Sequence, residues 1–231
     1  MKNHSVIKNI LDLFFPITCV VCGEELLGEE TGACIKCLYR LPVTNNFKVK
    51  GNTAEKFMAG RLLFDKIATY CVYSEGGILK PIIHSLKYYN NKEIGILLGR
   101  MFACDLLESD FLDTVDLIVP VPLHPKKLKN RGYNQSEIIA KGISDKTSIP
   151  ISTGNLVRLI NNPTQTKRTK TQRWDNVRGI FKVIEPMLFE NKHILLVDDV
   201  ITTGSTIEAC GIALQRCNQL KISIATLGQV F

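Results

Sequence analysis

The sequence predicts an α/β fold in which a mostly parallel sheet is flanked by helices and preceded by a small four-cysteine knuckle. Two apolar runs, residues 194–197 and 116–121, predict buried strands that are each followed by a polar turn and a helix-like stretch. Two C-x-x-C pairs near the N-terminus, separated by 11 residues, predict the knuckle. A chain of 231 residues is long enough for one substantial domain and such an appendage.

The composition is that of a folded protein, because 45% of the residues are hydrophobic and 22% are charged. Residues 5–15 are the one stretch that resembles a targeting peptide, but Asp12 interrupts its apolar run and no small-residue cleavage site follows. No run approaches the ~20 apolar residues of a membrane span. We therefore expect a cytoplasmic protein without a membrane span.

The N-terminal region is predicted to contain a short amphipathic helix, residues 5–15, and then a metal knuckle. The four clustered cysteines are Cys19, Cys22, Cys34 and Cys37. Four thiolates satisfy the tetrahedral preference of Zn²⁺ and leave no open coordination position, so the spacing favours a structural zinc site. A redox role for the two pairs is the alternative, but neither pair begins a helix in a strand–helix unit.

Composition also suggests where the domains divide. Residues 41–61 are polar and rich in Asn and Gly, which is typical of a linker or long loop. We expect an N-terminal unit at 1–45, a linker at 46–60 and a main domain at 61–231.

The elements of the main domain follow from hydrophobic periodicity. Strands are expected at 67–73, 116–121, 180–184, 193–197 and 221–227, the last of which closes the sheet. Helices are expected at 76–88, 93–107, about 135–144 and 207–217.

Positive charge is concentrated in one part of the chain. The formal net charge is +7, yet residues 120–178 carry twelve Lys and Arg against three Asp and Glu. The loop after strand 116–121 contributes Lys126, Lys127 and Arg131. A localised excess of this kind indicates a polyanionic ligand, either a pyrophosphate-bearing substrate or a nucleic acid, although a solvated basic turn remains the alternative.

Residues 161–173 have little apolar content and are expected to be exposed. Lys167, Arg168, Lys170 and Arg173 lie within seven positions there. The segment can act as a lid over a bound anion, or it can bind the phosphates of a single-stranded nucleic acid while Trp174 stacks on a base.

The most informative stretch begins with the strand at 194–197. Asp198 and Asp199 follow it, where the strand is expected to leave the sheet, and then come Thr202, Thr203, Gly204, Ser205 and Thr206 before a helix. Free amides at a helix N-terminus bind phosphate, whereas carboxylates accept hydrogen bonds from hydroxyl groups. A phosphorylated ribose fits both halves. A buried strand with a well-capped polar turn would explain the hydrophobicity but not the paired acids.

This stretch resembles the phosphoribosyl pyrophosphate (PRPP) loop of type I phosphoribosyltransferases, and the rest of the chain resembles one family in particular. The motifs shared with the ComF family are Pro-Val-Pro-Leu-His-Pro at 120–125, Arg-Gly-Tyr-Asn-Gln at 131–135, Arg-Trp-Asp-Asn-Val at 173–177, the Asp-Asp-x-x-Thr-Thr-Gly motif and the four-cysteine knuckle.

The resemblance implies a type I phosphoribosyltransferase-like fold, and an association with natural competence and the handling of incoming single-stranded DNA. It implies that Lys126, Lys127 and Arg131 lie in a pyrophosphate loop and that residues 161–178 form a mobile loop. Asp198 and Asp199 would be the catalytic acids, residues 202–206 would bind PRPP, Mg²⁺ would accompany PRPP, and a competence helicase is a possible partner.

Three functions remain open from the sequence. The chain can bind PRPP as a sensor or DNA-handling module, it can be an active transferase that displaces pyrophosphate with a nucleobase or amine in nucleotide metabolism or salvage, or it can be a nucleic-acid adaptor whose pocket is vestigial. The adaptor function explains Asp198 and Asp199 poorly, since carboxylates repel a DNA backbone.

Overall fold

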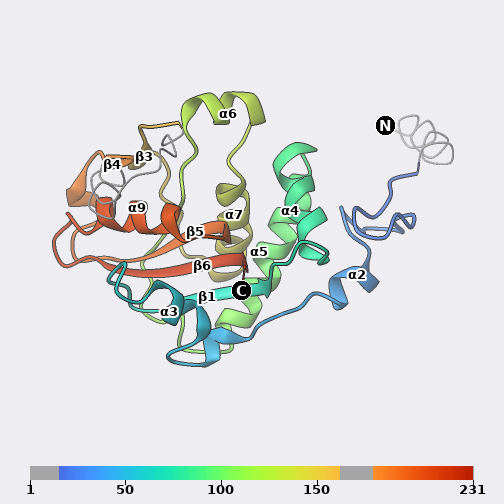
Figure 1. Ribbon diagram of the computed structural model, residues 1–231, viewed down its shortest axis with the longest axis horizontal. Coiled ribbons are helices and arrows are strands. Elements are labelled where there is room, and N and C mark those ends of the chain that lie inside the picture. The colour runs from blue at the N-terminus through green and yellow to red at the C-terminus, as the bar shows by residue number, and fades with distance from the viewer. Residues whose placement is uncertain (1–15, 162–178, 231) are drawn as a thin grey trace.

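A computed structural model describes residues 16–161 and 179–230 of the chain (Figure 1). Its main sheet has four parallel strands in the order β1-β6-β5-β2, and a two-stranded antiparallel sheet lies beside it. The main strands are β1 (Ile67–Val72), β2 (Leu117–Pro120), β5 (His193–Ile201) and β6 (Lys221–Gln229). The small sheet pairs β3 (Leu156–Arg158) with β4 (Phe181–Val183).

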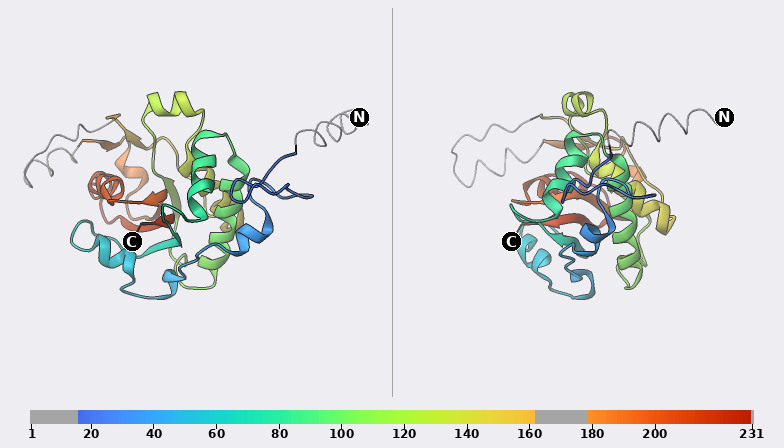
Figure 2. Two further views of the ribbon diagram at one scale, coloured as in Figure 1. Left: turned by 45° about the vertical axis from the view of Figure 1, so that its right-hand side comes forward. Right: turned by 90° about the vertical axis from the view of Figure 1, so that its right-hand side faces the viewer.

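Helices lie on both faces of the main sheet (Figure 2). The larger helices are α4 (Leu79–Tyr88), α5 (Lys92–Leu107), α7 (Gln135–Thr147) and α9 (Ser205–Leu214). The shorter ones are α2 (Ile35–Tyr39), η1 (Asn46–Lys48), α3 (Thr53–Met58), α6 (Pro125–Arg131) and η2 (Pro186–Leu188). No helix in the described part of the chain combines the length and hydrophobicity that crossing a bilayer requires.

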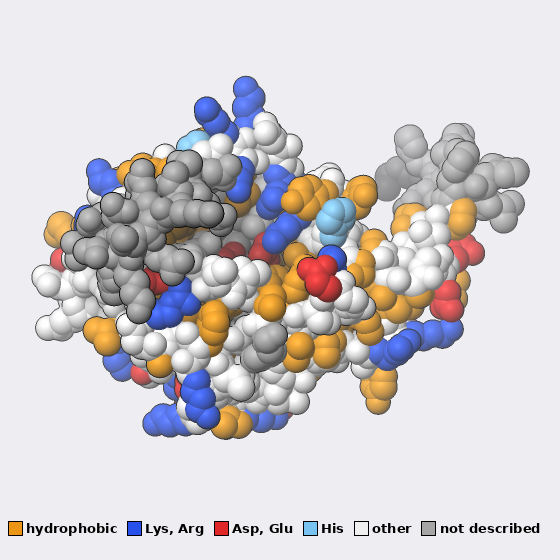
Figure 3. All heavy atoms as spheres, viewed as in Figure 1, with side chains coloured by type: hydrophobic (Ala, Val, Ile, Leu, Met, Phe, Trp, Pro, Cys, Tyr) orange, Lys and Arg blue, Asp and Glu red, His pale blue; other side chains and the backbone are white. Residues whose placement is uncertain are grey.

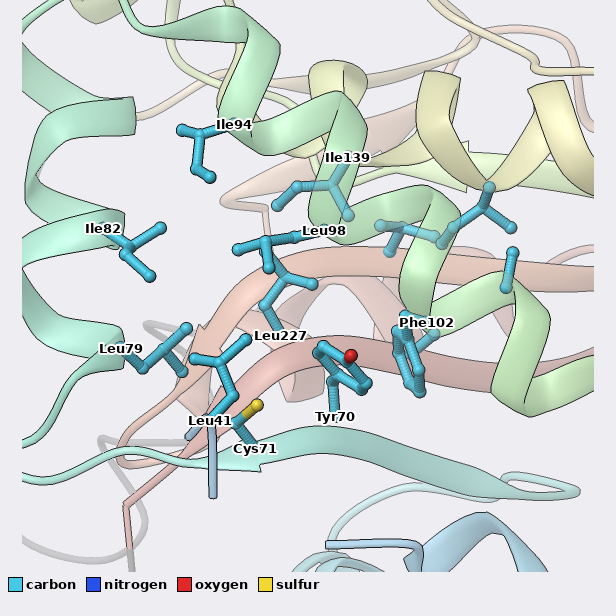
Figure 4. Close-up of a cluster of buried hydrophobic side chains, with 14 of the residues drawn as sticks. Leu41, Tyr70, Cys71, Leu79, Ile82, Ile94, Leu98, Phe102, Ile139 and Leu227 are labelled. Atoms are coloured by element: carbon cyan, nitrogen blue, oxygen red, sulfur yellow. The ribbon is translucent and has the colours of Figure 1, made fainter. Parts of the chain in front are cut away.

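The alternation of side chains along β5 divides the core into two clusters. Leu195 and Val197 join the cluster that packs against α4, α5 and α7, part of which is drawn in Figure 4. Ile194 and Leu196 join the cluster on the other face, under α3, α9 and the small sheet. Because both faces are covered, the strand has an uninterrupted apolar run, as the sequence predicts.

The knuckle is part of the first cluster. Cys19, Cys34 and Cys37 are buried there with Leu38 and Leu41 of the following segment. The predicted linker is also folded: η1 and α3 occupy residues 46–60. Its contacts with the sheet are polar as well as apolar, and the division into domains stays a prediction.

Two asparagines attach the 46–60 segment to β1. The Asn46 side chain donates to Thr69 Oγ1 at 2.8 Å and accepts from the Thr69 backbone N–H at 3.0 Å. The Asn52 side chain donates to the Ile67 carbonyl at 2.9 Å and caps α3. The sequence analysis treated these asparagines as loop residues. In the structure their side chains form hydrogen bonds to β1, which lies at the edge of the sheet and has a neighbouring strand on one side only.

Three sequence predictions about the sheet were wrong in detail. The strand at 221–227 does not close the sheet, since β6 pairs with β1 and β5 on its two sides. The strand at 180–184 belongs to the small sheet, where it pairs with β3, which the sequence analysis missed because it is only three residues long. The basic loop after β2 contains the helix α6, which begins at Pro125 and is capped by the His124 ring.

Candidate functional site

The two acids lie inside β5 and not beyond its end. β5 runs to Ile201 because its pairing with β6 continues through Asp198 opposite Thr226 and Ile201 opposite Gln229. Asp198 and Asp199 are therefore buried, with 7% and 5% of their surface exposed. The expectation that the strand leaves the sheet at Asp198 was wrong, although both acids do lie in the carboxyl-terminal half of the strand, at the edge where open α/β sheets bind ligands.

Asp198 is held by donors from two directions. The Ser136 hydroxyl, at the start of α7, donates to Asp198 Oδ1 at 3.0 Å, and the Asp199 backbone N–H donates to the same oxygen at 2.9 Å. Burial and the adjacent Asp199 charge nevertheless raise the pKa of Asp198 to about 7. The carboxyl group is therefore poised to change its protonation state when a ligand or cation arrives.

Asp199 is paired with a lysine that the sequence analysis did not assign to the site. Lys87 Nζ, in the last turn of α4, lies 2.9 Å from Asp199 Oδ2. The contact is an ion pair without hydrogen-bond geometry, and it satisfies no lone pair of that buried oxygen. No local pattern in the sequence could reveal Lys87, because it reaches Asp199 only through the packing of α4 on the sheet.

The Thr-Thr-Gly turn at 202–204 joins β5 to α9, which begins at Ser205, two residues before the start of the helix predicted at 207–217. Thr202, Thr203 and Ser205 are exposed, and Gly204 has φ +73° immediately before the first residue of α9. A Cβ at Gly204 would lie 2.7 Å from Met58 Sδ and 2.8 Å from Arg61 Nη1, so glycine is required for both conformation and space. The Ser205 amide makes one long contact of 3.5 Å with Thr203 Oγ1, and the next amides of the first turn of α9 are left for a ligand.

Arg61 fixes this turn from outside. Its Nη1 donates to the Thr203 carbonyl at 2.6 Å, while Nε and Nη2 donate to Glu208 Oε2 at 3.1 and 2.5 Å. The guanidinium therefore ties the turn to the first turns of α9. This positioning role also escaped the sequence analysis, since Arg61 stands at the edge of the predicted linker.

Four cations from three elements, Lys87, Lys127, Arg131 and Arg158, lie near one another. The pKa of Lys127 is lowered by burial and by the charges of Arg158, Arg131 and Lys87, which places these groups near one another. Lys127 and Arg131 come from α6, whereas Arg158 comes from β3. In Figure 3 acidic side chains lie near the middle of the face, below Lys and Arg side chains under α6. Lys126 is exposed on α6, and Arg158 is an addition to the predicted set.

Several predicted residues lie outside the described part of the chain. These are Lys167, Arg168, Lys170, Arg173 and Trp174 of the basic segment, and the N-terminal helix at 5–15. Their assignments stay predictions.

The four cysteines of the knuckle converge on one point. Their sulfur atoms all lie within 4.8 Å of one another, and the Cys22 and Cys34 sulfurs are 3.7 Å apart. A tetrahedral ion with bonds of about 2.3 Å to sulfur places its ligands about 3.8 Å apart, so this cluster fits such an ion. Although burial raises it, backbone N–H groups of Cys22, Cys34 and Val21 lower the pKa of Cys19 to about 6, which favours the thiolate that a metal needs.

Comparison with known proteins agrees with this geometry. Residues 141–229, which include α9 and the acids of β5, match the phosphoribosyl transferase domain. A solved structure of the allosteric regulatory enzyme of purine biosynthesis aligns with 57% of this chain and 25% of its own, at 22% identity and a TM-score of 0.40. Purine phosphoribosyltransferase from Pyrococcus horikoshii aligns with 62% of this chain and 76% of its own, at 17% identity and a TM-score of 0.36. The family match makes the carboxyl-terminal part of the chain similar to phosphoribosyl transferase domains.

The curated relatives extend this similarity over more of the chain. DNA utilization protein YhgH from Escherichia coli (strain K12) is 28% identical over 192 residues, which cover 82% of this chain and 80% of that protein. Competence protein F from Haemophilus influenzae is 26% identical over 225 residues, 91% of this chain and 96% of that one. Competence protein ComFC from Bacillus subtilis is 26% identical over 172 residues, 68% and 62% of the two chains. The names of these relatives agree with the resemblance of the chain to the ComF family.

Proposed function

We propose that this protein binds PRPP at the edge of its sheet where β5 meets α9. The observation that carries the proposal is the juxtaposition of two buried acids, a phosphate-sized turn and a group of cations contributed by three other elements. Each part alone has a structural explanation. Together they match a ligand that carries a diol, a phosphate and a pyrophosphate.

The chain's own groups can be matched to the parts of the ligand. The carboxylates of Asp198 and Asp199 accept hydrogen bonds from the ribose hydroxyls. The amides of Ser205 and Thr206, at the start of α9, donate to the 5′-phosphate, and Thr203 and Ser205 add hydroxyls that lie 3.1 Å apart. Lys127, Arg131 and Arg158 face the pyrophosphate, with Lys126 at the exposed end of α6. Mg²⁺ bound with PRPP would neutralise further pyrophosphate charge.

Calorimetric titration with PRPP, with and without Mg²⁺, tests this proposal. Ribose 5-phosphate and inorganic pyrophosphate serve as controls, because each carries only part of the matched chemistry. We expect PRPP with Mg²⁺ to bind at least tenfold more tightly than either fragment. Equal affinities for PRPP and inorganic pyrophosphate would show that the site binds pyrophosphate without recognising the ribose, which would contradict the proposal.

We further propose that the protein acts in natural competence in the cytoplasm by handling incoming single-stranded DNA, alongside a competence helicase. The names of the relatives support this, since they refer to competence and DNA utilization. The candidate phosphate contacts are Lys167, Arg168, Lys170 and Arg173. Replacing Lys167, Arg168 and Lys170 by Ser should flatten the slope of log affinity against log salt by about 0.7 per lost contact. An unchanged salt slope of DNA affinity together with loss of PRPP binding would show that this segment acts on PRPP, as a lid, and not on DNA.

An active phosphoribosyltransferase of nucleotide metabolism or salvage is the second candidate, and the intact pair of acids favours it over a vestigial pocket. Release of pyrophosphate from PRPP in the presence of any nucleobase or amine would establish it. The acids would then hold the ribose while positive charge grows on it, and the cations would hold the leaving pyrophosphate. PRPP binding without release with any acceptor would leave the binding function alone.

For the knuckle we propose one structural Zn²⁺, held by Cys19, Cys22, Cys34 and Cys37. The spacing of the four sulfurs supports this, and a closed set of four thiolates leaves no position for catalysis.

A further inference from the structure

A groove with a volume of about 550 Å³ lies between the knuckle and α4. Val20 of the knuckle lines it on one side, and Pro81, His84, Ser85 and Tyr89 line it on the other. The groove is separate from the ribose site, since Lys87 of the same helix points to Asp199 instead. None of the motifs in the sequence accounts for it.

The floor of the groove contains an unsatisfied polar group. Ser85 is only 2% exposed, and its hydroxyl has no hydrogen-bond partner among residues 16–161 and 179–230. A buried hydroxyl without a partner costs free energy that an apolar side chain at the same place would avoid. The oxygen has almost no solvent-exposed surface, so a ligand in the groove would contact the exposed rings that border it and not this hydroxyl.

Two exposed aromatic rings, those of His84 and Tyr89, line the groove, and the Tyr88 ring lies beside His84. The His84 ring centroid lies 4.7 Å from that of Tyr88 and 5.5 Å from that of Tyr89. Tyr88 and Tyr89 are 65% and 72% exposed, so this contiguous group of three rings is open to a partner. Hydrophobic and His side chains gather between α6 and the knuckle in Figure 3. Solvent-exposed rings in contact with one another form a platform on which flat ligands stack.

Positive charge flanks the rings on two sides. The guanidinium of Arg131 lies over the Tyr88 ring at 5.5 Å, and Lys80 borders the groove one helical turn before His84. Lys80 is paired with Glu75, which also lines the groove and is 89% exposed, so a nucleic-acid phosphate can replace this carboxylate as the partner of Lys80. The combination of stacking rings and flanking cations is what proteins use to hold single strands without reading their sequence.

We propose that this groove binds a single-stranded nucleic acid, with its bases stacked on His84, Tyr88 and Tyr89. The proposal rests on the proposed handling of single-stranded DNA and gives that function a surface within the described part of the chain, made of other residues than Lys167, Arg168, Lys170 and Arg173. The platform holds three contiguous rings and continues past Arg131 toward the basic group, which suits several linked nucleotides better than one free base. Because Tyr88 adjoins Lys87, a strand in the groove would pass beside the ribose site.

Fluorescence anisotropy with a dye-labelled 20-nucleotide oligo-dT tests this surface. Tyr89→Leu and His84→Leu should each weaken binding about tenfold, the loss expected for one stacked base. Tyr89→Phe should retain most of the affinity, since it keeps the ring. Tyr39→Leu is the matched control, because Tyr39 is 91% exposed on α2 and does not line the groove. The salt slope should not change in Tyr89→Leu, since no charge is removed.

The outcomes separate this inference from the functions on which it rests. Oligo-dT affinity can fall in the triple Ser variant of the basic segment and stay unchanged in Tyr89→Leu and His84→Leu. That result would contradict binding in the groove but not the handling of single-stranded DNA. Equal or tighter binding of a duplex, or displacement of the strand by millimolar thymidine, would also overturn it. Failure of the wild-type protein to bind oligo-dT would remove DNA handling as well, while PRPP affinity, unchanged in Tyr89→Leu, would leave the sugar-phosphate site standing.

Discussion

Asp198 lowers the folding stability of the protein at neutral pH, which is expected of a residue kept for a ligand. Asp198 is buried and beside a second carboxylate, so its pKa is raised to about 7 in the folded protein. A carboxyl group whose pKa rises on folding stabilises the protein when protonated, and that stability is lost as the pH rises from about 4 to about 7. Such a residue is difficult to explain as part of a core.

Asp198→Asn should therefore stabilise the ligand-free protein at pH 8, by on the order of 2 kcal/mol. The amide oxygen can still accept from Ser136 and from the Asp199 N–H, both of which bond to Oδ1 in the wild type. The difference should shrink as the pH falls and approach zero near pH 4, where the wild-type carboxyl begins to be protonated in the unfolded chain as well. Urea denaturation at the two pH values measures it, and a variant that is less stable at pH 8 would show that the ionised group supports the fold.

The ion pair between Lys87 and Asp199 makes a second residue-scale prediction. Lys87→Met leaves a buried carboxylate without its counter-ion and should lower the free energy of unfolding by about 1–3 kcal/mol. Most of that loss should disappear when Asp199→Asn is added in a double-mutant cycle.

Lys80→Met is the matched control on the same helix. Lys80 pairs with Glu75, whose side chain is 89% exposed, so its loss should cost less than about 1 kcal/mol. Equal costs for the two lysine variants would contradict a special role for Lys87.

At the scale of elements, two helices meet so closely that only glycine fits between them. A Cβ on Gly99 of α5 would lie 2.3 Å from the Ile139 carbonyl oxygen, and one on Gly142 of α7 would lie 2.2 Å from that of Ile96. The obstacles are backbone atoms, which cannot rotate away as a side chain can. This contact sets the position of α7, which carries Ser136 to Asp198.

Gly142→Ala should accordingly cost about 1–3 kcal/mol or more, because α5 and α7 must separate to accept the methyl group. It should also lower PRPP affinity, since Ser136 would move with α7. Gly76→Ala is the control, as a Cβ there meets nothing within 4 Å. Thermal unfolding of both variants decides the matter, and an unchanged midpoint for Gly142→Ala would show that the interface is looser than described.

The sequence predicted the elements better than their arrangement. Apolar runs and hydrophobic periodicity predicted β5, α5 and α7, and in the structure the Asn134 side chain caps α7. β3 and α6 were missed, because a three-residue strand has no periodicity and a basic helix with no buried residue has no apolar face. The two acids could be identified because their motif is local in the sequence. The roles of Lys87, Arg61 and Arg158 could not, because they depend on contacts between segments that are distant in the sequence.

At the scale of the whole molecule, the knuckle and the main sheet share one hydrophobic core. Gly32 packs so closely on α5 that a Cβ would lie 2.6 Å from Asn91 Nδ2 and 2.9 Å from Ile94 Cβ. Cys34 and Cys37 belong to the same buried cluster as Phe102 of α5. Loss of the metal would therefore disturb the main domain and not just the appendage.

Elemental analysis of reduced protein should find one zinc per chain, and Cys22→Ser should lower thermal stability far more than it alters PRPP affinity. Cys104→Ser is the control, since Cys104 is exposed and lies outside the cluster. Sub-stoichiometric zinc in freshly purified protein would rule out this site. Equal stability of the two serine variants would show that the metal is dispensable for the fold.

The central claim is that the acids of β5 hold the ribose of PRPP, and the PRPP affinity of Asp198→Asn and Asp199→Asn tests it most directly. Hydrogen bonds to charged groups contribute about 1.5–3 kcal/mol each, so each variant should bind PRPP about one to two orders of magnitude more weakly. Both should remain folded by circular dichroism. Calorimetry that finds unchanged PRPP affinity in both variants would contradict the assignment of this site.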